Sequence, residues 1–234
     1  RAGSRRIPGK NMKDLAGHPL IAYTIAAAQQ SGVFAGVYVC LEADHADLRA
    51  VVDRCGVEPI WRSSRTATDD AADILWVTEA LTFFKTPPDA FAILRPTAPF
   101  RTADTIRRAY AQFTAADQTA DTLRAVERVT QSPYKMWTQH GPATPIMPLL
   151  SDSHHDGTPY HSSPTQTHPA VWVQNASLEM AYASVVRDYG TLTGRKIAPF
   201  FTEGYEGFDL NTMADWREAE YLVASGAALL PEIP

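Results

Sequence analysis

The sequence has few cysteines, lacks a long apolar run and has no excess of positive charge. Cys40 and Cys55, its two cysteines, lack the spacing of a metal site, so we expect reduced thiols and a cytoplasmic protein. No stretch approaches the roughly 20 apolar residues that cross a membrane, and no signal-peptide pattern occurs, so no membrane partner is expected. The formal net charge of −5 argues against nucleic acid as a partner.

Two common phosphate-binding motifs are also missing. The spacing fits neither a Walker A loop nor the GxGxxG fingerprint, which argues against a P-loop NTPase and against a dinucleotide-binding dehydrogenase. The positive charge that is present gathers within the first thirteen residues, at Arg1, Arg5, Arg6, Lys10 and Lys13. Such a cluster on an otherwise acidic protein indicates a small anionic ligand, with a solvated basic tail as the alternative.

Hydrophobic periodicity predicts one large α/β domain in 234 residues. Helices are expected at residues 19–32, 45–55, 71–84, 104–113 and 213–225. Short apolar strands are expected at residues 37–41, 57–61, 90–94, 122–129, 171–173 and 208–210. Continuous apolar strands that alternate with helices predict an open, mostly parallel sheet covered on both faces.

Residues 132–173 break this alternation. The segment is rich in proline, histidine, serine and threonine, but its aromatic residues indicate order. We therefore expect an inserted arm that acts as a lid or a dimer contact, with residues 1–131 and 174–234 forming the main domain. His154, His155 and His161 lie in this segment, and we interpret them as polar loop residues rather than as a metal site.

The opening stretch, RAGSRRIPGKN, has the composition of a loop around a polyphosphate. Gly3 and Gly9 allow backbone N–H groups to approach phosphate oxygens. Arg1 and Lys10 supply fixed positive charge, which stabilises the negative charge that grows on a departing pyrophosphate. The hydrogen-bonding side chains in the same stretch are Ser4 and Asn11.

Four segments together resemble the acylneuraminate cytidylyltransferases, the enzymes that make CMP-sialic acid and related CMP-nonulosonates. These are RAGSRRIPGKN with the HPLIAYTI that follows, LRPTAPFR (94–101), SPYKMW (132–137) and EGFDLNTMADWREAE (206–220). The resemblance runs in order over almost the whole chain. It implies a three-layer, Rossmann-like nucleotidyltransferase fold with a small dimerisation arm, and a homodimer.

The resemblance also implies roles for individual residues. Arg1, Lys10 and Asp209 would be catalytic, and Asp209 with Asn211 would hold Mg²⁺. The implied nucleotide-binding residues are Arg1, Ser4, Arg5, Lys10, Asn11, Arg62, Thr68 and Arg95. The residues expected to bind the sugar acid are Lys135, Gln166, Gln174 and Asn175.

Three features depart from the family pattern. An apolar strand usually comes directly before the family's first arginine and is missing here, so we expect that the sequence starts after that strand. The family usually has a second aspartate where this chain has Asn211, whose carbonyl oxygen can bind Mg²⁺ but brings no charge. Ala176 replaces a glycine near the sugar pocket, so the acceptor is not fixed as sialic acid.

The implied reaction is an in-line attack of a sugar hydroxyl on the α-phosphorus of CTP, with release of pyrophosphate. The acceptor would be a sialic acid-like 2-keto sugar acid, and catalysis would come from positioning and charge neutralisation. Two alternatives stay open. One is transfer of GMP or UMP to a different acidic or phosphorylated acceptor, and the other is a nucleotide-binding protein without catalytic activity.

Overall fold

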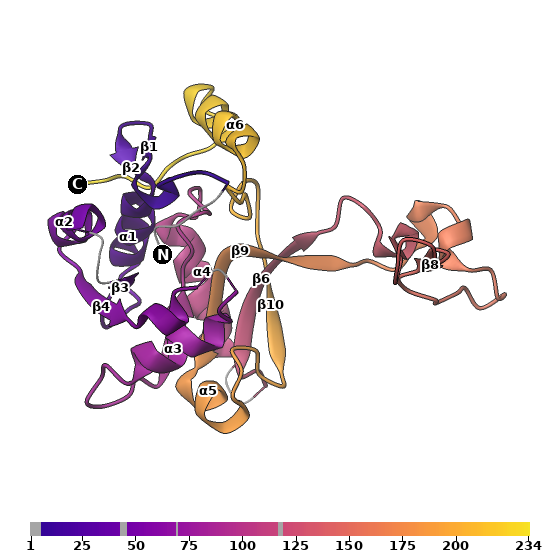
Figure 1. Cartoon of the computed structure of the whole chain (residues 1–234), viewed down its shortest axis with the longest axis horizontal. Helices are drawn as coiled ribbons and strands as arrows, with labels where there is room; N and C mark the ends of the chain where they lie inside the picture. The colour runs from indigo at the N-terminus through magenta and orange to yellow at the C-terminus, as the bar shows by residue number, and fades with distance from the viewer. Residues whose placement is uncertain (1–5, 43–45, 69, 117–118) are drawn as a thin grey trace. The chain divides into compact units, whose positions relative to one another are not determined.

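The computed structural model describes residues 6–42, 46–68, 70–116 and 119–234 (Figure 1). Its α-helices are α1 (Leu20–Ser31), α2 (Ala46–Arg54), α3 (Asp73–Leu81), α4 (Ala103–Ala115), α5 (Ala183–Tyr189) and α6 (Met213–Ala224). Its longer strands are β3 (Tyr38–Glu42), β4 (Glu58–Arg62), β5 (Ala90–Ile93), β6 (Thr122–Arg128), β9 (Trp172–Tyr182) and β10 (Ile197–Phe201). The chain forms two compact units: unit 1 is residues 1–125 with 175–234, and unit 2 is residues 126–174.

Two sheets form the centre of unit 1. A four-stranded sheet has the order β10-β6-β9-β5, and a two-stranded sheet pairs β3 with β4. The β3–β4 pair is parallel and the β5–β9 pair is antiparallel, so both strand directions occur. β3 is an edge of the smaller sheet and β5 is an edge of the larger sheet.

Helices cover both faces of the larger sheet. Along β5, Ala90 and Ala92 pack into a cluster with α1 and α4, whereas Phe91 and Ile93 pack into a cluster with α3 and α5. Because side chains of a strand alternate between faces, these two clusters are the two sides of one sheet. Three layers result, as expected for an α/β fold whose sheet is covered on both faces.

A third buried cluster joins the two ends of the sequence. Ile7 and Leu15 pack with Leu210 and with Trp216 of α6, and all four side chains are at most 1% exposed. Burial of large apolar side chains is the main favourable term in such packing. This cluster places the first described residues beside the segment that precedes α6.

Most expected elements form within a few residues of their predicted bounds, but residues 208–210 do not form a strand. Phe208–Leu210 is irregular because its backbone bonds a loop and a side chain instead of a neighbouring strand. The Leu210 N–H donates to the Thr97 carbonyl at 2.8 Å, and Lys10 Nζ donates to the Leu210 carbonyl at 2.6 Å. Helix α5, strand β10 and most of β9 were not predicted.

Unit 2 contains short strands and 3-10 turns around a polar aromatic cluster. The ring of Tyr160 contacts those of Tyr134, His154 and His168. The Ser163 hydroxyl lies 3.0 Å from His154 Nε2 and 3.2 Å from His168 Nε2. Hydrogen bonds and ring contacts therefore hold this small unit together where a large apolar core is lacking among its residues.

Candidate functional site

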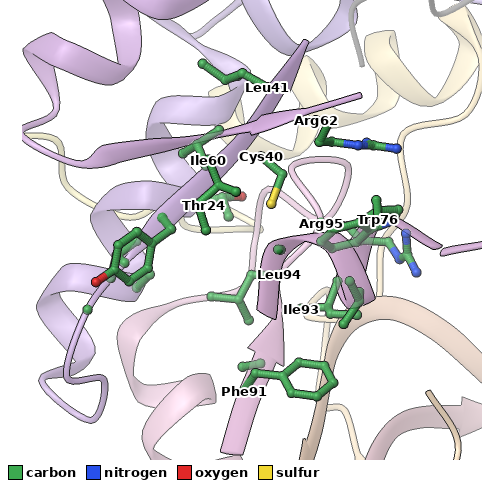
Figure 2. Close-up of a pocket in the computed structure, with 18 of the residues that line it drawn as sticks. Thr24, Cys40, Leu41, Ile60, Arg62, Trp76, Phe91, Ile93, Leu94 and Arg95 are labelled. Carbon is green, nitrogen blue, oxygen red and sulfur yellow. The ribbon is translucent and has the colours of Figure 1, made fainter. Parts of the chain in front are cut away.

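A cavity of about 690 Å³ lies between strands β3 and β5 (Figure 2). Its walls come from β3, β5, α1 and α3, and most of the lining is apolar. One end is polar, where Arg62, Trp76 and Arg95 gather in Figure 2. An apolar interior with a few convergent polar groups is typical of a ligand site, and the polar end is the part that suits a charged ligand.

The residues that follow β4 form one wall of the polar end. Arg62 ends β4, and its guanidinium lies over the Trp76 ring at 5.4 Å from the centroid. Arg62 Nη2 donates to the Thr66 carbonyl, while Arg62 Nε is buried without a hydrogen-bond partner among the described residues. A buried donor without a partner is costly, so this N–H is suited to donate to a ligand in the cavity.

Arg95 is tied to two carboxylates at the other side of the polar end. Its Nη2 lies 2.7 Å from Asp73 Oδ2 and 3.0 Å from Glu179 Oε1. Arg124 makes a second ion pair with Glu179, at 3.0 Å, and the Trp76 indole N–H donates to Asp73 at 2.8 Å. Burial lowers the pKa of Arg95, but Asp73 and Glu179 outweigh it and raise the pKa above its usual value. The guanidinium therefore stays charged and holds β5, β9 and α3 together.

A second group of polar residues surrounds the segment before α6. Lys10 Nζ reaches the Leu210 carbonyl at 2.6 Å, across 200 residues of sequence. On either side of Leu210, Asn211 Nδ2 donates to Asp209 Oδ2 at 2.6 Å, and Arg6 Nη2 donates to Asn211 Oδ1 at 3.0 Å. Lys10 directly precedes Asn11, which lines the cavity. The N-terminal turn thus connects this group to the cavity.

Asp209 has one oxygen that fits a cation. Its Oδ1 is buried and has no hydrogen-bond partner in the described part of the chain. Groups of three or more histidine, cysteine, aspartate or glutamate residues suited to hold a metal are absent among the described residues. Mg²⁺ often takes only one or two carboxylates from a protein and completes its shell with substrate phosphates and water, so one free carboxylate oxygen is compatible with it.

The side-chain amide of Asn211 is not oriented as a second Mg²⁺ ligand would be. Its NH₂ group faces Asp209 and its carbonyl oxygen accepts from Arg6. To offer that oxygen to an ion shared with Asp209, the amide would have to turn over. Asn211 as a ligand therefore stays a prediction.

Arg101 is a buried cation behind the cavity wall. Its guanidinium donates to the Ser177 and Arg95 carbonyls and to Thr24 Oγ1 at 2.9 Å, and Thr24 lines the cavity. Burial lowers the pKa of Arg101 to about 9, so the charge is retained at neutral pH. The residue fixes the loop 95–101 against α1 and β9.

The structure gathers most of the predicted nucleotide-binding residues that it describes. The cavity lining includes Asn11, Arg62, Thr68 and Arg95. Lys10, Asp209 and Asn211 form the neighbouring group. Arg1, Ser4 and Arg5 lie outside the described residues.

The predicted sugar-binding residues fall in both units. Asn175 belongs to unit 1, where its Nδ2 donates to Thr202 Oγ1 at 2.9 Å. Lys135, Gln166 and Gln174 belong to unit 2, where Lys135 Nζ donates to the His161 carbonyl at 2.9 Å. Each of these three side chains is exposed within unit 2. Their role in binding stays a prediction.

Sequence reasoning missed several residues of the site. The sequence gives Arg6 no role beyond the N-terminal basic cluster, and Glu79 belongs to no motif. Asp73 and Trp76 gave no signal, because their spacing is that of an ordinary first helical turn. Only the fold brings Asp73 to Arg95, 22 residues later in the sequence.

A family profile described as Cytidylyltransferase matches residues 1–143. The chain belongs to this cytidylyltransferase family. Among curated relatives, it is 39% identical over 113 residues to a CMP-N,N'-diacetyllegionaminic acid synthase of Legionella pneumophila, covering 47% of this chain and 48% of the relative. It is 34% identical over 132 residues to an N-acylneuraminate cytidylyltransferase of Escherichia coli, covering 56% of this chain and 30% of the relative.

A pseudaminic acid cytidylyltransferase of Campylobacter jejuni is 33% identical over 117 residues, with 48% of this chain and 50% of the relative covered. The chain thus spans half or less of the length of these relatives. The match therefore establishes the family.

Solved structures agree with the fold. A CMP:2-keto-3-deoxy-manno-octonic acid synthetase complexed with CTP superposes with a TM-score of 0.67 at 14% identity, covering 96% of this chain and 95% of that one. A 4-diphosphocytidyl-2C-methyl-D-erythritol synthase from Anaerococcus prevotii superposes with a TM-score of 0.62 at 9% identity, covering 92% and 93%. At these identities the likeness shows the fold alone. Among the described helices, none combines the length and apolarity needed to cross a bilayer.

Proposed function

We propose that this protein transfers CMP from CTP to the hydroxyl of an acidic, sialic acid-like 2-keto sugar, with release of pyrophosphate. The observation that carries the proposal is the hydrogen bond of 2.6 Å from Lys10 Nζ to the Leu210 carbonyl. It joins the phosphate-loop motif to Asp209, next to a cavity whose polar end contains other predicted nucleotide-binding residues. Membership of the cytidylyltransferase family supports CTP as the nucleotide.

The mechanism assigns each group a task. Lys10, with Arg1, holds the β- and γ-phosphates and stabilises the charge that develops on the pyrophosphate. Arg62 Nε donates to the nucleotide at the polar end, and Asn11 adds a hydrogen bond. Asp209, with Asn211 as the second expected ligand, would hold Mg²⁺, which neutralises phosphate charge when bound. The sugar hydroxyl then attacks the α-phosphorus in line, and most of the rate comes from orientation.

The acceptor side rests on the family resemblance. We propose that the sugar acid contacts Lys135, Gln166, Gln174 and Asn175, of which lysine suits a carboxylate and the amides suit hydroxyl groups. A homodimer is supported by exposed apolar side chains in unit 2, including Trp137, Ile146 and Met147. Two free cysteines are compatible with the expected cytoplasmic location.

A panel of CTP, UTP, GTP and ATP with several 2-keto sugar acids tests the proposal through pyrophosphate release. We expect release with CTP only. Preference for UTP or GTP would favour the alternative nucleotide, and CTP binding without release for any acceptor would favour the non-catalytic alternative.

The Lys10→Ala variant tests the residue that carries the proposal. Turnover with CTP should fall about a hundredfold, the usual scale for one preorganised charge contact. Lys196→Ala, at an exposed lysine directly before strand β10, is the control and should leave turnover unchanged. Equal turnover of both variants would remove Lys10 from the site.

A further inference from the structure

Glu79, on helix α3, accepts hydrogen bonds from the turn that follows β4. Its Oε1 lies 3.0 Å from the Ser63 backbone nitrogen, and its Oε2 lies 3.2 Å from Ser63 Oγ and 2.7 Å from Thr66 Oγ1. Thr66 is only 2% exposed, so the turn is anchored from inside the fold. One carboxylate thus holds three donors of residues 63–66 against α3.

The same turn carries Arg62. Thr66 links the two residues. Its hydroxyl donates to Glu79, and its backbone carbonyl accepts from Arg62 Nη2. Trp76 lies three residues before Glu79 on α3, and its ring faces the Arg62 guanidinium at 5.4 Å. Helix α3 therefore fixes Arg62 through the Trp76 ring and, by way of Thr66, through Glu79. A ring contact alone does not fix the rotation of the guanidinium, whereas the hydrogen bond to Thr66 does.

The charge of Glu79 matters for this arrangement. The hydrogen bond from Thr66 lowers the pKa of Glu79, as do those from Ser63 and the nearby Arg62 charge. The group is therefore ionised at neutral pH. A carboxylate can accept all three hydrogen bonds, and charge-assisted bonds are about twice as strong as neutral ones. Glutamine at this position would present an NH₂ group to donors and lose part of the set.

We propose that Glu79 is a positioning residue for the nucleotide site. By fixing residues 63–66, it sets the orientation in which Arg62 presents its buried Nε, which has no hydrogen-bond partner in the described ranges, to the polar end of the cavity. The same turn leads to Thr68, which also lines the cavity. This inference rests on the proposed function for its effect on CTP, but its structural step can be measured without substrate.

The kinetic test uses Glu79→Gln and Thr66→Val. We expect the KM for CTP to rise about tenfold in Glu79→Gln with kcat within about twofold, because uniform binding of ground and transition states is lost. Thr66→Val keeps a side chain of similar volume but removes one of the three donors, so it should raise KM less. Glu58→Gln, an exposed glutamate at the start of β4, is the matched control and should change neither constant. An unchanged KM in a folded Glu79→Gln variant overturns the proposal.

A double-mutant cycle separates positioning from a general loss of stability. If Glu79 acts through Arg62, the pair Glu79→Gln with Arg62→Ala should have the KM of Arg62→Ala alone. If the double variant instead shows the product of the two single-variant increases in KM, Glu79 acts independently of Arg62 and the proposal is overturned.

Hydrogen exchange of backbone amides tests the positioning role of Glu79 without relying on the proposed function. The Ser63 N–H should exchange at least tenfold faster in Glu79→Gln than in the wild type, with no nucleotide present. Absence of CTP turnover in the wild type would count against the proposed function, while Ser63 exchange would still decide the structural step. Unchanged exchange at Ser63 overturns that step whatever the protein's activity.

Discussion

At the scale of single residues, the exchange of an expected aspartate for Asn211 is the feature with the clearest chemical consequence. The amide donates to Asp209, and Arg6 occupies its carbonyl oxygen. The chain thereby avoids two adjacent carboxylates before any cation binds, since like charges at this distance repel. Less charge at the site also means weaker attraction of Mg²⁺.

The Asn211→Asp variant should need less Mg²⁺ for half-maximal turnover, by a factor of about ten, because a second carboxylate strengthens cation binding. A Mg²⁺ titration of pyrophosphate release measures the change. Gln112→Glu, the same amide-to-carboxylate exchange at an exposed position on α4, is a control for added charge. Superimposable titration curves for wild type and Asn211→Asp would place this side chain away from the ion.

At the scale of elements, helix α6 positions the segment 209–211 through its N-terminal cap. Thr212 Oγ1 accepts from the Asp215 N–H, and Asp215 Oδ2 accepts from the backbone of Thr212 at 2.6 Å and of Asn211 at 2.8 Å. Helix α4 has the same kind of capping box, formed by Thr102 and Thr105. Thr102 and Thr212 therefore offer two equivalent caps for comparison, of which only Thr212 lies next to Asp209 and Asn211.

Thr212→Ala and Thr102→Ala should each lower the free energy of unfolding by about 1 kcal/mol, as loss of a cap usually does. Urea denaturation measures that loss. Only Thr212→Ala should also raise the Mg²⁺ requirement, because Asp209 and Asn211 directly precede its helix. If both variants raise it equally, the α6 cap has no special role in the site.

Several elements were predictable from local pattern alone. The apolar face of α1 and its end at Gly32, which has a φ of 68°, follow from periodicity and from a C-cap that favours glycine. Helix α5 was missed because seven residues are too few for a clear period. The strand predicted at 208–210 was wrong because the Leu210 backbone bonds Lys10 and Thr97 instead of a neighbouring strand, while the apolar side chains of Phe208 and Leu210 pack with Trp216.

At the scale of the whole molecule, the cavity separates the edges of two sheets. β3 and β5 each form an edge facing it, and the wall between them is apolar along Val37–Leu41 and Ala90–Leu94. Backbone groups of such edges are best satisfied by a further strand. A strand supplied to the gap between them is therefore expected to pair with both edges.

An apolar segment of about five residues fused ahead of Arg1 matches the length of β3 and is expected to pair between β3 and β5. Amide exchange of both strands should slow, and alkylation of Cys40, which lines the cavity, should slow relative to Cys55. The same segment with a central proline cannot complete the ladder and serves as the control. Equal exchange and labelling with either segment would contradict the prediction.

The apolar side chains of unit 2 make a separate prediction about assembly. If the proposed homodimer forms through unit 2, Ile146→Glu, at a residue 57% exposed, should shift it to a monomer in analytical ultracentrifugation, since a buried unpaired charge opposes association. Leu229→Glu, at a residue 74% exposed in unit 1, is the control and should leave the mass unchanged. A dimer that tolerates Ile146→Glu would remove this surface from the interface.

The sequence by itself determined the fold class and the family, and it predicted a phosphate loop, because these depend on periodicity and on residues close together in the chain. Lys10, Asn11 and Asp209 could be named from their motifs. The partners of Arg62 and Arg95 could not, since Glu79, Asp73 and Glu179 reach them only after helices and strands pack. The tertiary structure decided those contacts because hydrogen bonds and ion pairs depend on distance in space, which sequence spacing does not encode.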